Sequence, residues 1–397
     1  MRCARPAATN TLNMLYYLSV KVLALARNTP FQGIFSFMRL FGYITFRCAS
    51  AAVTALALSW WLGPRMIDWL KKLKFGQDYA DRAEEAGNLQ ARILSKRGTP
   101  TMGGLMIVLV LDVTTVLWAQ WNTLIQLTLL TVVVLCGLGF IDDYAKITQQ
   151  NSKGVQEFIK MWVQGALAIF VAFYLWRLPA TSALVSQVMV PFYKYPVAQG
   201  TFGVVLGIIL TSLTIVGSSN AVNLTDGLDG LAIGCTAIVS VVFLVLTYLS
   251  GNQKAAAYLQ IPHVSGAGEL TVFCSAMIGA SLGFMWFNCH PAQVFMGDTG
   301  SLALGGVLGM VAVLIHQPLV LALAGGVFVA EAGSVLIQRS WFKYTRFKYG
   351  QGRRVFLMAP LHHHFEKLGW HESQVVTRFY ILCVLCAVVA LSTLKIR

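Results

Sequence analysis

Long apolar runs constrain this chain more than any other feature. Predominantly apolar stretches near 20 residues recur along its 397 residues. A helix of about 20 such residues spans the ~30 Å hydrocarbon core of a bilayer. Hydrophobic residues make up 56% of the chain and charged residues only 12%, which argues against a string of soluble domains. We therefore expect an all-α polytopic membrane protein, because helices satisfy their own backbone polar groups in lipid.

Ten segments have the composition of transmembrane helices. They are residues 42–63, 103–120, 124–141, 158–176, 201–218, 231–250, 271–288, 302–316, 318–338 and 375–394. Residues 14–26 are apolar but too short to span, so we expect an interfacial helix there. This predicts two parts: an N-terminal extension with an interfacial helix, residues 1–41, and one integral-membrane domain, residues 42–397.

The connections between these segments differ sharply in charge. Loops 64–102, 142–157 and 339–374 hold most of the basic residues, whereas the alternate connections hold only Arg177, Lys194 and Lys254. Cytoplasmic loops carry an excess of Lys and Arg, so the first set is predicted to be cytoplasmic and both termini periplasmic. The formal charge of +14 follows from this bias, and the chain has no basic-aromatic module that would predict nucleic acid as a partner. We expect an electropositive cytoplasmic face that gathers membrane lipids and an anionic substrate.

Five of the sixteen acidic residues lie at or just beyond the ends of apolar segments, on the side predicted to be cytoplasmic. They are Asp142, Asp143, Asp226, Asp229 and Asp298. An acid at a membrane boundary is costly unless a cation, a partner or water holds it, so these are functional candidates. An ion-coupled transporter is the alternative class, but it predicts acids at the bilayer midplane and an internal repeat, and neither is evident. The acids favour an enzyme that handles phosphate through a divalent metal.

Lys96-Arg97-Gly98-Thr99-Pro100-Thr101 leads into the second predicted span. Its lysine and hydroxyls could bind phosphate, although a helix entry with a basic flank is the alternative. Asp142 and Asp143 end the third span, where a helix C-terminus disfavours negative charge. Two like charges so close to low dielectric make at least one a candidate base.

Asn223, Asp226 and Asp229 recur every three residues after the fifth span. On a helical or 3₁₀ turn they would share roughly one face. The segment lacks the ligand spacing of a calcium loop. Asp298 lies between two glycines and is followed by hydroxyls, which suits the oxygen ligands of Mg²⁺. Capping of the eighth helix is the alternative role for Asp298, and the two roles are compatible.

His362, His363 and His364 follow Pro360 in the last predicted cytoplasmic loop. Side chains on consecutive positions rarely converge on one ion. Recognition of a sugar, peptide or phosphate is therefore favoured over a transition-metal site.

These five segments together resemble the polyprenyl-phosphate N-acetylhexosamine-1-phosphate transferases, in matching order from about Arg47 to Arg397. The run APLHHHFEKLGW favours the branch that acts on a muramoyl-pentapeptide. The resemblance implies transfer of phospho-N-acetylmuramoyl-pentapeptide from UDP-MurNAc-pentapeptide to undecaprenyl phosphate, giving lipid I and UMP with Mg²⁺. It also implies a bacterial cytoplasmic (inner) membrane and an active site facing the cytoplasm.

The resemblance also implies a role for each motif residue. Asp298 would be the Mg²⁺ ligand, Asp142 the base or orienting group for the lipid phosphate, and Asp143 part of the metal or phosphate shell. The substrate-binding residues would be Lys96, Thr101, Lys160, Asn223, Asp226, Asp229, Phe295, Gln338, His362, His363 and His364. Among these, Phe295 would stack on uracil.

Several alternatives stay open at this point. A sister transferase that loads N-acetylglucosamine phosphate onto the same lipid is the nearest, and direct attack and an aspartyl-phosphate on Asp298 are both compatible with the residues. The oligomeric state is also open, a homodimer included. Glu331 and Asp112 lie within predicted spans but outside the motifs, and we expect them to serve helix packing.

Overall fold

The computed structural model describes residues 14–26, 33–73, 98–148, 154–191, 193 and 195–394. These residues form helices and no strand, apart from one isolated bridge between Val188 and Ala198. The helices are α1 (Met14–Ala26), η1 (Ile34–Gly42), α2 (Ile44–Lys72), α5 (Gly104–Trp118), α6 (Thr123–Thr148), α7 (Glu157–Arg177), α8 (Ala183–Ser186), α9 (Gly200–Thr225), α10 (Leu231–Gly251), α11 (Gln253–Leu259), α12 (Ala267–Asn288), α13 (Gly297–Leu314), α14 (Pro318–Ala324), α15 (Gly326–Tyr349), α16 (Leu361–Lys367) and α17 (Glu372–Ser392).

Every predicted span is helical, which confirms the all-α polytopic class. Seven of the described helices are long and apolar enough to cross a membrane, and two bent pairs raise this to nine. The remaining predicted span, residues 103–120, corresponds to α5, which has 15 residues. The chain is an integral membrane protein.

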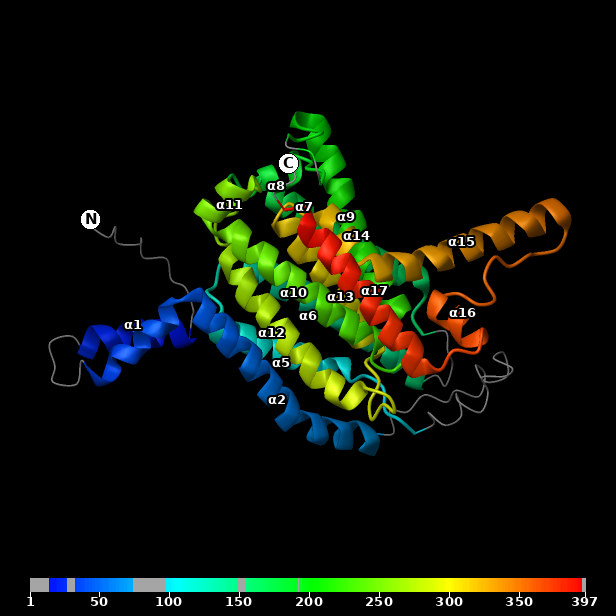
Figure 1. The fold of residues 1–397 in the computed structure, drawn as a ribbon, viewed down its shortest axis with the longest axis horizontal. Coiled ribbons are helices and arrows are strands. Elements are labelled where there is room, and N and C mark those ends of the chain that lie inside the picture. The colour runs from blue at the N-terminus through cyan, green and yellow to red at the C-terminus, as the bar shows by residue number, and fades with distance from the viewer. Residues whose placement is uncertain are drawn as a thin grey trace.

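The predicted span over residues 318–338 is helical but bent. The segment breaks between α14 and α15, with an angle of 87° between the two helices. Gly325 and Gly326 lie at the break, and paired small residues are a common cause of sharp kinks. As a result α15 leaves the bundle at a steep angle and extends away from it, with α16 beside it (Figure 1).

Among the seven described helices that could each span a membrane alone, α13 is the most buried, with 89% of its apolar window inside the protein. It packs against α6 and α9, and small residues such as Gly305 and Gly309 let the α9 backbone approach closely. Because α13 begins at Gly297, this packing brings Asp298 next to the ends of α6 and α9. The central helix of the bundle therefore positions the candidate site.

At the opposite end of α2 and α12 lies a buried ion pair. The Arg47 guanidinium contacts the Glu269 carboxylate at 2.6 and 2.8 Å and donates to the Trp118 carbonyl oxygen at 3.1 Å. Such bidentate pairs fix geometry as well as charge. This pair connects α2, α5 and α12 far from the motif acids.

The N-terminal region is helical where it is described. α1 covers the residues predicted to form an interfacial helix and lies at the edge of the bundle (Figure 1). The short η1 helix meets α2 at 93°. Residues 1–13 lie outside the described residues, and the division at residue 41 stays a prediction.

Candidate functional site

Three carboxylates from two helices converge at one end of the bundle. Asp142 and Asp143 come from α6, Asp298 comes from α13, and one oxygen from each lies within 4.8 Å of the others. The Asp142 and Asp143 side chains are 0% and 1% exposed, whereas Asp298 is 17% exposed. Hard oxygen donors at this separation fit a divalent cation such as Mg²⁺. Asp298 is the member of the group that reaches solvent.

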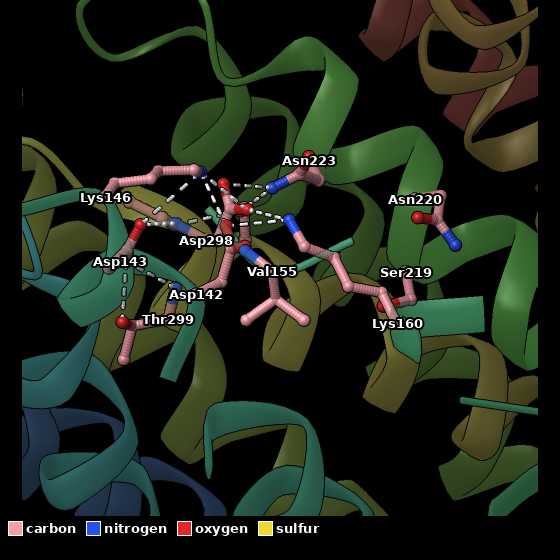
Figure 2. A network of polar contacts seen from close by, with 12 residues as sticks. Asp142, Asp143, Lys146, Val155, Lys160, Ser219, Asn220, Asn223, Asp298 and Thr299 are labelled. Atoms are coloured by element: carbon pink, nitrogen blue, oxygen red, sulfur yellow. Dashed lines mark hydrogen bonds and ion pairs between the residues drawn. The ribbon is translucent and has the colours of Figure 1, made fainter. Parts of the chain in front are cut away.

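Two lysines sit among these carboxylates (Figure 2). The Lys146 amine lies 2.6 Å from Asp142 Oδ2 and 3.0 Å from Asp298 Oδ2. The Lys160 amine lies 2.7 Å and 3.0 Å from the same two oxygens. Two ammonium groups thus share the space between Asp142 and Asp298, and three carboxylates with two lysines leave a formal charge of −1.

Asp143 is held by the first turn of α13. Its carboxylate accepts hydrogen bonds from the Thr299 hydroxyl at 2.7 Å, the Thr299 backbone N–H at 3.0 Å and the Asp298 N–H at 3.2 Å. The free N–H groups of a helix N-terminus favour an anion at this position. Gly297 has a φ of 73°, and a side chain there would crowd both Asp143 and Thr101. Asp143 therefore fixes Asp298 with respect to α6.

Asn223 and a backbone amide complete the cluster. Asn223, in the last turn of α9, donates to Asp298 Oδ1 and to the Ser301 hydroxyl, both at 2.8 Å. The Val155 N–H donates to Asp142 Oδ1 at 2.8 Å. Behind Asn223, the Gln164 amide bonds Asn220 and Ser219. Both oxygens of Asp298 therefore accept hydrogen bonds, Oδ1 from Asn223 and Oδ2 from the two lysine amines.

Thr101 and Phe295 lie on two loops that pair through their backbones. The Phe295 N–H donates to the Pro100 carbonyl at 2.8 Å, and the Gly103 N–H donates to the Phe295 carbonyl at 2.9 Å. Thr101 is 2% exposed, and Phe295 is partly exposed. Both loops lie beside the carboxylate cluster, and substrate contacts for either residue stay a prediction.

Asp229 belongs to a second acidic cluster. Its Oδ2 lies 3.1 Å from His290 Nδ1, which lies 3.4 Å from Glu372 Oε2. Glu372 also accepts the Asp229 N–H at 2.9 Å, and Asp229 accepts the Ala292 N–H at 3.2 Å. This second cluster ties the loop after α9, the loop before α13 and the start of α17 together.

The expectation that Asn223, Asp226 and Asp229 share a face is wrong for Asn223 and Asp229. The helix ends at Thr225, so the three-residue period is lost in the turn that follows. Asn223 bonds Asp298, whereas Asp229 bonds the second cluster. Asp226 is the C-cap residue of α9 and is half-buried between them.

The three consecutive histidines bond three different partners. His362 Nδ1 pairs with Glu331 at 3.1 Å, His363 Nδ1 pairs with Glu366 at 2.7 Å, and His364 Nδ1 accepts the Leu357 N–H at 3.1 Å. They do not converge on one ion. Burial lowers the pKa of His363 from its ordinary value, and the hydrogen bond to Glu366 offsets part of this effect.

Gln338, a further predicted substrate residue, lies away from both acidic clusters and bonds a loop backbone. The Gln338 amide donates to the Phe356 carbonyl at 3.0 Å and accepts the N–H groups of Val355 and Phe356. Gln338 therefore shapes the loop that leads to the histidines, and its role in substrate binding stays a prediction. Lys96 lies outside the described residues.

Sequence reasoning missed Lys146, His290 and Glu372 in these networks and predicted only a helix-packing role for Glu331. Lys146 lies in a segment predicted to be a basic loop, but it is four positions after Asp142, a spacing that brings side chains together on a helix. His290 comes from a loop, Glu372 from the start of α17 and Glu331 from within α15, all remote in sequence from the residues they bond. Their partners follow only from the packing of the helices.

The sequence matches two family profiles and is similar to relatives over nearly its full length. The profile described as glycosyl transferase family 4 matches residues 125–316, and phospho-N-acetylmuramoyl-pentapeptide-transferase signature 1 matches residues 96–108. The chain is 46% identical to the phospho-N-acetylmuramoyl-pentapeptide-transferase of Methylacidiphilum infernorum (isolate V4), over 97% of this chain and 100% of the relative. The relatives of the same name from Opitutus terrae (strain DSM 11246 / JCM 15787 / PB90-1) and Syntrophus aciditrophicus (strain SB) are each 46% identical, over 92% and 93% of this chain and 98% of their own lengths.

Proposed function

Because the chain belongs to the phospho-N-acetylmuramoyl-pentapeptide-transferase family, we propose that it transfers this phospho-sugar-peptide from UDP-MurNAc-pentapeptide to undecaprenyl phosphate. The products are lipid I and UMP, and the process is peptidoglycan synthesis. The observation that supports the proposal best is the grouping of Asp142, Asp143 and Asp298 around two lysines at the end of the bundle.

The reaction brings two phosphate groups together, and the charge of the site suits this task. Unit charges 4 Å apart interact by about 4 kcal/mol at an effective dielectric near 20. Lys146 and Lys160 offer two ammonium groups at one point, where they offset the repulsion between acceptor and donor phosphates. When these amines turn toward phosphate, their contacts to Asp298 Oδ2 are released.

Asp298 is the residue we assign to Mg²⁺, because it is the accessible carboxylate of the cluster and Asn223 orients it. When bound, the ion supplies charge neutralisation at the donor pyrophosphate and at the UMP leaving group. Asp143 holds the first turn of α13, and so holds Asp298, while Asp142 keeps both lysines in place and orients the lipid phosphate.

The donor pocket is proposed from the loops around this cluster. Phe295 stacks on uracil, and Asp226 and Asp229 line the nucleotide side. Lys96, Thr101 and Gln338 contribute further donor contacts, as do the three histidines. The enzyme is assigned to the bacterial cytoplasmic (inner) membrane, with residues 42–397 as the transferase domain, the site facing the cytoplasm and both termini periplasmic.

A donor-competition assay tests the proposal. The purified chain in detergent is given undecaprenyl phosphate, Mg²⁺ and either UDP-MurNAc-pentapeptide or UDP-N-acetylglucosamine, and UMP release is measured with and without EDTA. We expect metal-dependent release with the pentapeptide donor alone. Turnover of the N-acetylglucosamine donor alone would assign the chain to the sister transferases instead.

A further inference from the structure

The hydrogen-bonded pair of Glu331 and His362 lies outside the carboxylate cluster and is completely buried. The two side chains are 0% and 1% exposed, and both Glu331 oxygens are used on one residue. One oxygen accepts the His362 backbone N–H at 3.1 Å, and the other faces Nδ1 at 3.1 Å. Since a carboxylate oxygen accepts, Nδ1 carries a hydrogen, and the ring is fixed at both its backbone and its side chain.

The opposite ring atom, His362 Nε2, is buried and has no hydrogen-bond partner among the described residues. It lies against Gly227, so closely that a Cβ built on this glycine would overlap it. Buried polar nitrogens are almost always hydrogen-bonded. An orphan atom in a motif histidine therefore indicates that this contact serves something other than stability.

Gly227 lies in the turn that joins the two acidic clusters. Asn223, in the last turn of α9 before it, bonds Asp298, and the turn ends at Asp229, whose N–H donates to Glu372. Each end of the turn is thus held by a carboxylate, and the His362 ring supports its middle. Asp226, one of the proposed donor residues, is the immediate neighbour of this contact.

Glu331 comes from α15, the helix that leaves the bundle after the break at Gly325 (Figure 1). We propose that Glu331 is a positioning residue for the donor site. By holding His362 Nε2 against Gly227, it fixes the turn Asp226–Asp229 in the conformation that receives the nucleotide, and it links the position of α15 to that turn. This inference rests on the proposed transferase function and adds a residue to its machinery.

A double-mutant cycle isolates this contact. In Gly227→Ala the new methyl group meets His362 and the turn shifts, so donor kcat/KM falls by about 10²-fold, the scale expected for a 1 Å misplacement, with a higher donor KM. In His362→Ala the obstacle is gone, so adding Gly227→Ala to that background changes the donor KM less than about threefold. The acceptor KM is expected to stay near wild type in every case.

Glu331 itself is tested by Glu331→Ala and Glu331→Gln. We expect Glu331→Ala to raise the donor KM. In Glu331→Gln the side chain still accepts the His362 N–H, so the donor KM should return most of the way to the wild-type value. Gly333→Ala is the matched control, because it lies on the same helix and a Cβ there meets nothing within 4 Å. Melting temperature and gel filtration in detergent check folding. If Glu331→Ala does not fold, the Gly227→Ala cycle decides, since Gly227 is exposed in a turn.

The outcomes separate the two proposals. If Gly227→Ala costs as much without the His362 ring as with it, or if Glu331→Ala changes kcat and both KM values equally, Glu331 has only a structural role. The transferase function would stand in that case. If the wild-type chain turns over no UDP-MurNAc-pentapeptide, the transferase function fails and the positioning role fails with it.

Discussion

The two acidic clusters differ in how their charge is compensated. In the Asp142, Asp143 and Asp298 cluster, three carboxylates share two lysine ammonium groups. In the Asp229 and Glu372 cluster, two carboxylates share one imidazole and otherwise accept backbone N–H groups. The first uses mobile charges on long side chains, and the second uses fixed groups of the main chain.

This difference predicts different tasks. Lysine amines can move toward an incoming phosphate and leave their carboxylates to a metal, so the first cluster can exchange its cations. Backbone amides cannot move without unfolding the loop, so the second cluster holds loops in place. We therefore expect changes in the first cluster to reduce kcat and changes in the second to reduce stability and donor affinity.

The largest effect is expected for Asp298→Asn. The amide keeps the shape of the side chain but loses the charge that holds metal and lysines. We expect kcat to fall by about 10³-fold or more, the range seen when a preorganised electrostatic group is removed. UMP release over a range of Mg²⁺ concentrations measures this loss. Melting temperature and gel filtration in detergent check that the variant is folded. Near-normal activity of a folded Asp298→Asn variant would show that Asp298 is not the metal ligand.

A smaller loss of kcat is expected for Lys160→Gln. The amine contacts Asp142 and Asp298 and is 18% exposed. Without it Lys146 still compensates the cluster, so we expect about a 10²-fold loss. The steady-state rate of UMP release with both substrates saturating gives kcat directly. Lys254→Gln, at a residue in α11 outside both clusters, is the control. A kcat equal to wild type in Lys160→Gln would show that Lys146 alone is sufficient.

The apolar spans and the first cluster were largely predictable from the sequence. Each predicted span is helical because about 20 apolar residues have few other structures available in lipid. Asp142, Asp143, Lys160, Asn223 and Asp298 were assigned to one site and are indeed bonded together. Their grouping follows from a common end of the bundle, which charge bias had indicated.

The place of Lys146 in the first cluster and the separation of Asp229 from Asn223 could not be predicted, because both depend on where helices end. α6 continues to Thr148, beyond the predicted boundary at residue 141, and this brings Lys146 onto the face of Asp142. α9 stops at Thr225, and this separates Asp229 from Asn223. A hydropathy pattern locates the apolar part of a helix, but polar turns beyond it are stabilised by tertiary contacts that a sequence does not show.

Glu372→Gln tests the second cluster. The amide oxygen can still accept the Asp229 N–H, but the charge facing His290 is lost. We expect the free energy of unfolding to fall by about 1–3 kcal/mol, the cost of leaving a buried polar group poorly paired. The donor KM should rise severalfold, while the Mg²⁺ concentration for half-maximal activity stays the same. A shift in that Mg²⁺ concentration would show that the second cluster also affects the metal, and would end the distinction between the two.

The smallest effect is expected in the pH profile, through the imidazole–carboxylate pair of His363 and Glu366. This pair resembles His290 and Asp229 in type but lies in neither cluster. Burial lowers the pKa of His363 below 6.5, so the ring is neutral at pH 7 and any acid limb that it causes lies below pH 6.5. Because its pKa is lowered, His363 binds fewer protons in the folded chain than in the unfolded chain. The stability that the neutral His363 contributes is therefore lost as pH falls below 6.5.

Glu366→Gln sharpens this last prediction. Glu366 raises the pKa of His363 against the effect of burial, so its loss should move the acid limb of donor kcat/KM to still lower pH. His363→Ala should remove the limb. The exposed Glu157, which lies 3.9 Å from Arg339, provides the control variant Glu157→Gln. A limb that moves to higher pH in Glu366→Gln would mean that another group titrates, because a neutral partner cannot stabilise the imidazolium better than a carboxylate does.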